Sequence, residues 1–291
     1  MLEGTIVKGY SGFYYVQTKD FLWECSLRGK YRVKDQDFLV GDRVLITPIA
    51  EDKAVIEQVL ERKNQLTRPA VANVEQVIIV MSFASPKPDL NLLDRLLVLS
   101  GHHGLTGIIC FNKLDLIAVE VGLKLIKIYQ NIGYSVLGVS AKTRQGVGDL
   151  EKVFKNKLSV LAGPSGVGKS SLLQAIQPEF VLKTGRVSEK TQRGRHTTRH
   201  VELLKLNNGG YVADTPGFSR VDLPQLARED LAFYFPEIAN FGASCRFTNC
   251  LHRGEPGCAV EDAFRQGLIN EERIKNYQSF LTEVIQNERR Y

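Results

Sequence analysis

The first 60 residues alternate between short apolar, β-branched or aromatic runs and turn residues such as glycine, aspartate and lysine. Runs of this kind, separated by turn residues, are typical of β-strands. The pattern predicts five strands, over residues 2–8, 13–18, 22–27, 43–48 and 54–60. Five strands in so short a segment favour an OB-type β-barrel. The polar stretch that follows, residues 61–70, predicts a linker.

From residue 77 the pattern changes to continuous apolar runs that alternate with helical periodicity. Continuous apolar runs are typical of parallel strands that helices cover on both faces. Strands are expected at 77–83, 107–111, 136–139 and 158–162, and helices at 90–100, 116–130, 147–154 and from Lys169. In such a sheet, ligands bind beyond the carboxyl ends of the strands.

A basic segment and a helical region complete the chain. Between Lys183 and Lys205 stand seven lysine or arginine residues without apolar periodicity, so a switch loop is expected there. A solvated basic loop without a switch role stays the alternative. Residues 201–206 and 211–213 then predict a hairpin around Asn-Asn-Gly-Gly. Helical periodicity follows, and it ends in a charged amphipathic helix over 270–290. We expect three domains, formed by residues 1–66, 67–222 and 223–291.

Composition sets limits on the class of protein. A chain of 291 residues with 43% hydrophobic content is long enough for more than one domain. No apolar run approaches the roughly 18 residues of a membrane span, and the N-terminus does not have the pattern of a signal peptide. We expect a cytoplasmic protein without a membrane partner. Disulfides are not expected in that reducing compartment, and Cys25 and Cys110 are expected to be buried thiols.

The charge favours a polyanionic partner. The net charge is +6 and the isoelectric point is near 9.0. Aromatic residues lie among lysines and arginines in the N-terminal segment, where rings could stack on bases and cations could meet phosphates. The same rings could instead fill the barrel, and both interpretations stay open. The rings are Tyr10, Phe13, Tyr14, Tyr15, Trp23 and Tyr31.

A glycine-rich motif follows the last strand predicted for the sheet. Residues 163–170 read Gly-Pro-Ser-Gly-Val-Gly-Lys-Ser, which fits the GxxxxGKS phosphate loop. In this motif backbone N–H groups at a helix N-terminus hold phosphates, the lysine reaches the terminal phosphates, and the serine binds magnesium. By itself the motif predicts a nucleotide site without specifying the base.

Further motifs specify guanine. Residues 112–115, Asn-Lys-Leu-Asp, fit the NKxD signature, whose aspartate accepts from guanine N1–H and from the 2-amino group that adenine lacks. Residues 140–142, Ser-Ala-Lys, fit the loop behind the base. Residues 214–217, Asp-Thr-Pro-Gly, fit the DxxG segment, and Thr197 or Thr198 suits the switch threonine that closes on magnesium.

The order of these motifs is rotated, because the guanine reader precedes the phosphate loop instead of following it. One cyclic rotation relates this order to that of an ordinary GTPase. The whole chain resembles the ribosome-small-subunit-dependent GTPase A family of circularly permuted bacterial GTPases. The resemblance implies an N-terminal OB-type β-barrel, a central circularly permuted P-loop α/β GTPase domain and a C-terminal, mostly helical, zinc-binding domain.

The resemblance also implies an activity. It implies hydrolysis of GTP to GDP with Mg²⁺, stimulation by the small (30S) ribosomal subunit, contact with its rRNA and a role in late maturation of that subunit. The protein is expected to be a monomer. The residues expected to bind GTP and magnesium are Asn112, Lys113, Asp115, Ser140, Ala141, Lys142, Gly163, Pro164, Ser165, Gly166, Val167, Gly168, Lys169, Ser170, Ser171, Thr198, Asp214 and Gly217.

Three side chains are expected to act in catalysis. Lys169 stabilises charge on the transferred phosphoryl group, and Thr198 holds magnesium. Phe218 stands where many GTPases carry a water-orienting glutamine, so slow intrinsic hydrolysis is expected. The resemblance gives water positioning to the histidine of a Gly-x-His-Thr-Thr stretch, which is His196 in this chain. A loop histidine without a fixed role stays the alternative.

A cluster of metal-ligating residue types lies near the C-terminus. Three thiols and one imidazole stand within fourteen residues, in Cys245, Cys250, His252 and Cys258. Four such ligands with no open position suit a tetrahedral structural zinc ion. The resemblance likewise implies one structural Zn²⁺ at these residues.

Two rival functions stay open. One is an RNA-binding adaptor in which GTP is only a conformational ligand, which Phe218 would permit. The other is a nucleic-acid-dependent NTPase unrelated to ribosomes, which the guanine reader at Asp115 opposes. GTP turnover measured with and without ribosomal subunits distinguishes the adaptor from the ribosome-dependent enzyme.

Overall fold

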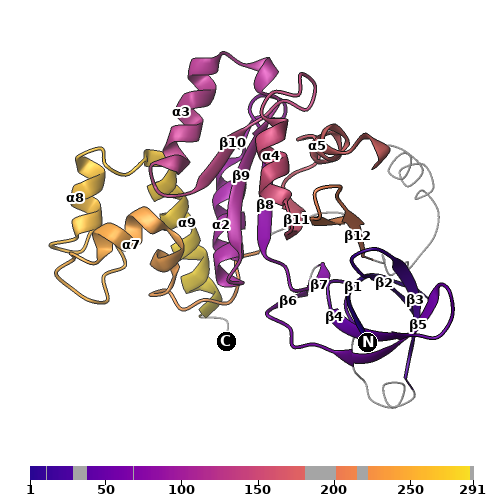
Figure 1. Cartoon of the computed structure of the whole chain (residues 1–291). Helices are drawn as coiled ribbons and strands as arrows, with labels where there is room; N and C mark the ends of the chain where they lie inside the picture. Colours follow the sequence, from indigo (N-terminus) through magenta and orange to yellow (C-terminus); the bar gives the residue numbers. More distant parts are fainter. Residues whose placement is uncertain (11, 29–37, 68, 181–200, 215–221, 289–291) are drawn as a thin grey trace, which may run out of the picture. The chain divides into compact units, whose positions relative to one another are not determined.

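A computed structural model describes the chain apart from residues 11, 29–37, 68, 181–200, 215–221 and 289–291 (Figure 1). The chain divides into two units, each built from segments that lie far apart in sequence. The first comprises Met1–Val77, Val147–Leu161 and Ser170–Pro216, and the second comprises Ile78–Gly146, Ala162–Lys169 and Gly217–Tyr291. The division into domains at residues 66 and 222 stays a prediction.

The N-terminal segment forms the predicted five-stranded barrel. Its strands are β1 (Leu2–Tyr10), β2 (Phe13–Gln17), β3 (Leu22–Leu27), β4 (Arg43–Pro48) and β5 (Lys53–Val59). Antiparallel pairs join β1 to β2, β2 to β3 and β4 to β5, whereas β3 and β5 run parallel. Strand β1 also pairs with β4 and closes the barrel. Each strand agrees with its predicted range to within two residues.

The aromatic residues of the barrel divide between two environments. Tyr14 and Trp23 pack against the buried core, as the barrel-filling interpretation predicts. Tyr10 and Phe13 are 58% and 47% exposed, as a stacking surface requires. Tyr31 lies outside the described residues. The buried core consists of Ile6, Val16, Cys25, Val44, Ile46, Ala54 and Ile56.

The segment after the barrel is not the open linker that its polarity predicts. Residues 61–70 contain β6 (Gln65–Thr67), which pairs with β7 (Ala70–Ala72) in a short hairpin. Arg62 donates from Nε and Nη2 to the two carboxylate oxygens of Asp42, at 2.6 and 2.8 Å. Asp42 is fully buried at the barrel. The segment is therefore tied to the barrel, because one of its charged side chains has a specific buried partner.

A hairpin and a parallel strand complete the sheet of the first unit. The elements are β11 (Leu158–Ala162), β12 (Glu202–Lys205), β13 (Tyr211–Asp214), α4 (Val147–Phe154), α5 (Lys169–Ile176) and the short helix η2 (Pro178–Phe180). Strand β11 is parallel to β13, and β13 is antiparallel to β12, which confirms the predicted hairpin. Strand β12 also pairs with β1, where Lys8 lies opposite Glu202 and forms an ion pair with it at 3.3 Å.

The second unit contains three further strands of the α/β fold. They are β8 (Gln76–Ser82), β9 (Thr106–Asn112) and β10 (Ser135–Gly138), and they are neighbours in the order β10–β9–β8. All residues of β8 are buried, as its continuous apolar run predicts. The helices here are α2 (Leu90–His102), η1 (Leu114–Leu116) and α3 (Val119–Gln130). The helix predicted over 116–130 begins at Val119, because the preceding residues form the separate turn η1.

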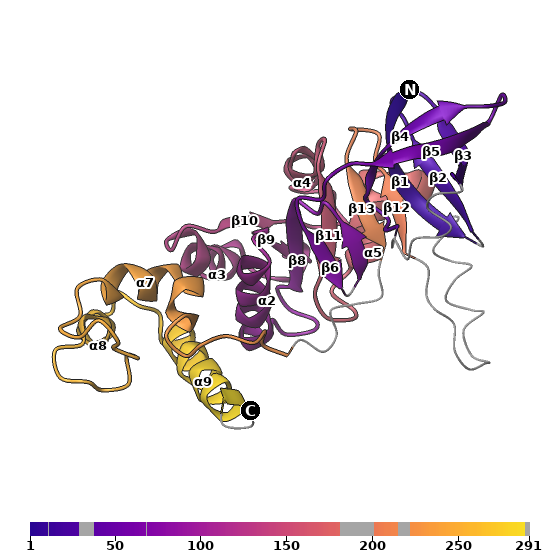
Figure 2. The same ribbon diagram turned by 90° about the horizontal axis from the view of Figure 1, so that it is seen from below.

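The C-terminal part of the second unit is mostly helical, as predicted. It consists of η3 (Leu231–Tyr234), α7 (Pro236–Gly242), α8 (Ala259–Arg265) and α9 (Glu271–Glu288). Helix α9 lies beside α2 in both views (Figures 1 and 2). Val98 of α2 shares one buried apolar cluster with Phe235, Tyr277 and Phe280. None of the helices in the described part of the chain has the length and apolarity needed to span a bilayer.

Candidate nucleotide site and metal centre

The phosphate loop connects β11 to α5, and its glycines are required by its backbone. Gly163, Gly166 and Gly168 have φ angles of 128°, 80° and 95°, a region that favours glycine. A Cβ atom on Gly163 would lie 2.0 Å from the carbonyl oxygen of Val80. Glycine at this position therefore lets the loop pass against β8.

Lys169, the first residue of α5, folds back over the loop. Its ammonium group donates to the carbonyl oxygens of Gly163 and Pro164, at 2.7 and 2.8 Å. Partial burial lowers the pKa of Lys169. Backbone N–H groups at such a loop and helix N-terminus form a cradle for phosphate. Ser165, Ser170 and Ser171 are exposed at this end of the loop and helix.

Asn112 ties the guanine reader to the other two nucleotide loops. It ends β9 and is 1% exposed. Its Nδ2 donates to the carbonyl oxygen of Val167 in the phosphate loop at 2.9 Å, and its Oδ1 accepts from the N–H of Ala141 at 3.2 Å. One amide thus holds together three segments that the sequence separates.

Lys113 reinforces this arrangement. It has a left-handed backbone conformation with φ of 65°. Its Nζ donates to the carbonyl oxygen of Gly166 at 2.7 Å and also to that of Ser85. No sequence motif marks Ser85, although its position just after the end of β8 is where ligand-binding loops occur in such sheets.

Asp115 presents an exposed carboxylate held by the Ser-Ala-Lys loop. Ser140 is buried, and its hydroxyl donates to Oδ1 of Asp115 at 2.6 Å. The Ser140 oxygen in turn accepts from the N–H of Thr143 at 3.1 Å. Lys142 is exposed beside it in the chain. A carboxylate fixed in this way suits the recognition of two adjacent donors on a guanine edge.

The predicted switch residues belong to two further segments of the chain. His196, Thr198, Gly217 and Phe218 lie outside the residues that the structure describes. Asp214 is the last residue of β13. The structure therefore brings together the residues predicted to read the base and those of the phosphate loop, and the roles given to all of these residues stay predictions.

The predicted metal ligands converge at one point. The ligand atoms of Cys245, Cys250, His252 and Cys258 all lie within 4.8 Å of one another. Nδ1 of His252 is 3.6 Å from Sγ of Cys245 and 3.5 Å from Sγ of Cys258, and these two sulfur atoms are 4.0 Å apart. A tetrahedral zinc ion places such atoms about 3.6 Å (sulfur to nitrogen) and about 3.8 Å (sulfur to sulfur) apart. The cluster can therefore hold a metal ion, and the distances between its ligand atoms fit zinc.

The backbone around the cluster is held by neighbouring polar groups. His252 has a φ of 59° and is 4% exposed. The carboxylate of Glu255 accepts from the N–H of Leu251 at 3.0 Å and from that of Arg253 at 2.6 Å. Glu255 could not be recognised from the sequence, because a carboxylate between two ligands has no spacing that distinguishes it from a surface residue.

Comparison with known proteins agrees with this geometry. The profile described as RsgA GTPase matches residues 59–224, and that of the RsgA N-terminal domain matches residues 3–56. A protein of Moorella thermoacetica named small ribosomal subunit biogenesis GTPase RsgA is 52% identical over 290 residues, which cover 100% of both chains. The chain belongs to the RsgA GTPase family. An RsgA protein of the same name from Geobacillus kaustophilus is 45% identical and is also matched over 100% of both chains.

Solved structures give the same result for the fold. YloQ, described as a circularly permuted GTPase, superposes with a TM-score of 0.83 at 38% identity, covering 99% of this chain and 96% of that one. YjeQ from Thermotoga maritima gives a TM-score of 0.83 at 38% identity, covering 98% of each chain. This member of the RsgA family is thus a GTPase with a circularly permuted core, an N-terminal barrel and a helical C-terminal part.

Proposed function

We propose that this GTPase binds the small (30S) ribosomal subunit through its rRNA, is stimulated by it, and acts as a monomer in the cytoplasm during late maturation of that subunit. The observation that carries the proposal is the full-length similarity to relatives named for small ribosomal subunit biogenesis. The net charge of +6 favours a polyanionic partner. The exposed Tyr10 and Phe13 offer rings that suit stacking on RNA bases.

The proposal gives each part of the nucleotide site a role. Asp115, held by Ser140, reads the guanine edge, and Lys113 lies against the base and the phosphate loop. The loop N–H groups and Lys169 stabilise charge on the phosphates. Mg²⁺ enters with GTP and would be held by Ser170 and Thr198, with Asp214 behind it. Phosphoryl transfer of this kind is catalysed mainly by positioning and by electrostatic stabilisation, so the protein needs to form no covalent intermediate.

Water positioning is assigned to His196. Phe218 has no polar atom with which to orient the attacking water, whereas an imidazole can hydrogen-bond to water and accept its proton near neutral pH. Intrinsic turnover should be slow, because Phe218 cannot take the part of a water-orienting glutamine. Contact of the basic segment around His196 with rRNA phosphates would position the imidazole for catalysis, which links hydrolysis to the subunit.

The Cys3His cluster is proposed to hold one structural zinc ion. Its four ligands leave no open position for a substrate or an activated water, so the ion would stabilise the C-terminal segment. Cys250→Ser should reduce bound zinc from about one equivalent to near zero. It should also lower the melting temperature, because the free energy of metal binding stabilises the folded form of so small a segment. Metal analysis and thermal melting check this result.

Cys25→Ala is the control for that experiment, because it removes a buried thiol that belongs to the barrel core and not to the cluster. This variant should keep about one equivalent of zinc. A full equivalent in Cys250→Ser, or none in the natural chain, would show that the cluster is not a zinc site.

Purified small subunits should raise GTP turnover by about 10²- to 10⁴-fold, the scale of one positioned acid–base group. Their affinity should fall steeply between about 50 and 200 mM salt, because lysine and arginine contacts to phosphates release counterions. Phosphate release at saturating GTP measures the stimulation, and large subunits at equal concentration are the control. Equal turnover with and without small subunits would favour the RNA-binding adaptor.

A further inference from the structure

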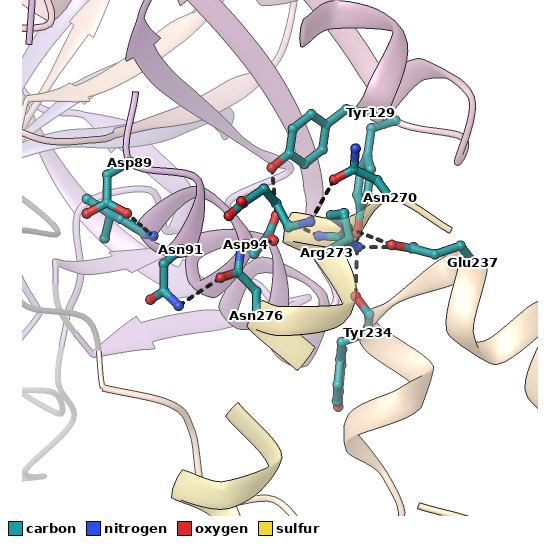
Figure 3. Close-up of polar contacts among 12 residues, drawn as sticks. Asp89, Asn91, Asp94, Tyr129, Tyr234, Glu237, Asn270, Arg273 and Asn276 are labelled. Atoms are coloured by element: carbon teal, nitrogen blue, oxygen red, sulfur yellow. Dashed lines mark hydrogen bonds and ion pairs between the residues drawn. The ribbon is translucent and has the colours of Figure 1, made fainter. Parts of the chain in front are cut away.

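A fully buried arginine joins the C-terminal helix to the rest of the second unit (Figure 3). Arg273 of α9 is 2% exposed. It donates from Nε and Nη2 to the two carboxylate oxygens of Glu237 on α7, at 2.6 and 3.1 Å. Its Nη1 donates to Oδ1 of Asp94 on α2, at 2.6 Å. The guanidinium carbon also lies 4.5 Å from the ring centre of Phe235. Arg273 therefore bridges three helices.

Asp94 is the point where these interactions reach α2. It accepts from the hydroxyl of Tyr129 at 2.9 Å and from Nδ2 of Asn276 at 2.7 Å, in addition to Arg273. Asn276 accepts in turn from Nδ2 of Asn91 at 3.0 Å. Burial raises the pKa of Asp94, and the three donors oppose this by stabilising its charge. The carboxylate is satisfied only while α9 stays in place, because α9 supplies two of these three donors.

The same helices hold the metal cluster. Tyr277, the residue after Asn276, is 1% exposed, and its hydroxyl donates to the carbonyl oxygen of Leu251 at 3.2 Å. Its ring centre lies 6.0 Å from that of the metal ligand His252. On α7, a Cβ atom at Gly242 would lie 3.2 Å from the His252 ring. His252 thus lies against α9 and α7, two of the three helices that Arg273 bridges.

The other end of the connection is the nucleotide site. Helix α2 begins at Leu90, and Asp89 caps it by accepting from the N–H of Leu92 at 2.9 Å. The loop before this cap contains Ser85, whose carbonyl oxygen accepts from Lys113. Lys113 also holds the phosphate loop at Gly166. Contacts within the second unit therefore lead from His252 through Arg273 and α2 to the nucleotide loops.

We propose that Arg273 couples the metal centre to the guanine-nucleotide site, so that zinc and GDP raise each other's affinity. Without metal, the segment 245–258 loses the binding free energy that orders it. The Tyr277 contact then weakens, and α9 can shift. Because Arg273 and Asn276 move with α9, Asp94 on α2 loses two donors, and the loop that holds Lys113 is no longer fixed.

Thermodynamic linkage between the two sites fixes the size and symmetry of the expected effect on affinity. Coupling between two sites in one protein usually amounts to about 5- to 150-fold in affinity, and the factor is the same in both directions. Zinc should therefore lower the dissociation constant of GDP by the same factor by which GDP lowers that of zinc. The inference rests on the proposed metal site, which the zinc analysis of Cys250→Ser tests separately and without nucleotide.

The experiment measures both affinities on the full chain. GDP binding is titrated calorimetrically on zinc-loaded and metal-free protein, and zinc affinity is measured by competition with a chelator, with and without GDP. Circular dichroism reports whether the metal-free protein stays folded. We expect factors of about 5 or more that agree between the two titrations.

Two variants test whether the coupling passes through the buried ion pairs of Arg273. Asp94→Asn/Glu237→Gln/Arg273→Met removes all three charges together, so no unpaired charge remains buried and the fold should persist. Asp42→Asn/Arg62→Met is the matched control, because it removes a two-bond ion pair with a buried aspartate in the first unit. The triple variant should bind zinc and GDP with a coupling factor below about 3, a fraction of the usual range. The control should keep the natural factor.

Three outcomes would overturn the proposal. The first is independent binding of zinc and GDP in the natural chain. The second is an undiminished coupling factor in the triple variant, which would exclude Arg273 as the link. The third is an equal fall in coupling in the control, which would mean that any loss of a buried ion pair weakens the coupling and that Arg273 has no specific part in it.

Discussion

Asp115→Asn is expected to convert the protein from a GTP-binding to an XTP-binding one, with GTP affinity lowered on the order of 10⁴-fold. Ser140 donates to Oδ1 of Asp115. An asparagine keeps that bond by placing its own oxygen there, so that its NH₂ group replaces Oδ2. A donor then faces the 2-amino group of guanine, which is also a donor, whereas the 2-oxo group of xanthine can accept. Calorimetric titration of both nucleotides measures the exchange.

Asp149→Asn serves as the control for this substitution. Asp149 is an exposed carboxylate on α4 that pairs with Lys152 at 2.8 Å, so its amide should leave nucleotide preference unchanged. Undiminished GTP affinity in Asp115→Asn would mean that another group reads the base. The phosphate loop would still account for binding of the triphosphate in that case.

Arg273→Met is expected to lower the free energy of unfolding by about 3–5 kcal/mol, because it leaves two buried carboxylates without their cation. Asp94 and Glu237 are 0% and 6% exposed, so water cannot replace the guanidinium readily. Denaturant unfolding followed by circular dichroism measures the loss. Neutralising the carboxylates in the same protein, as in Asp94→Asn/Glu237→Gln/Arg273→Met, should restore much of the stability.

The stability loss in Arg273→Met should depend on pH, and a substitution at a neighbouring lysine is its control. The folded-state pKa of Asp94 is already raised by burial, and losing Arg273 raises it further. A carboxyl group whose pKa is raised in the folded state destabilises the fold at pH values above the pKa of the unfolded chain. The difference in the free energy of unfolding between Arg273→Met and the natural chain should therefore shrink as the pH falls towards about 4. Lys275→Met, which removes an exposed pair with Glu271 on the same helix, should unfold like the natural chain. An equal loss in both variants would contradict the role of the buried cluster.

Features encoded by neighbouring residues are predictable from this sequence. The five barrel strands and the β12–β13 hairpin follow from alternating apolar runs and turn residues. The motifs predicted to bind phosphate and to read guanine are each contiguous, and the structure places each of them at the end of an apolar strand. Because Cys245 and Cys258 lie close in sequence, the metal cluster is also visible as a local pattern.

Pairings between distant residues could not be predicted. Arg273 and Asp94 are 179 positions apart, and a charged amphipathic helix gives no sign of which arginine it buries. Arg62 lies in a polar stretch whose composition predicts a linker. Only the structure shows that its side chain pairs with the buried Asp42. Ser85 has no motif around it, so its contact with Lys113 becomes apparent only when the loops are placed together.

The pairing of β1 with β12 has a consequence for dissecting this protein. A fragment that begins after the barrel would remove the neighbour of β12 and expose its unpaired backbone N–H and C=O groups. Exposed strand edges of this kind associate with one another and promote aggregation. A soluble GTPase fragment would therefore need to retain β1 or to gain a further charge or a proline on β12.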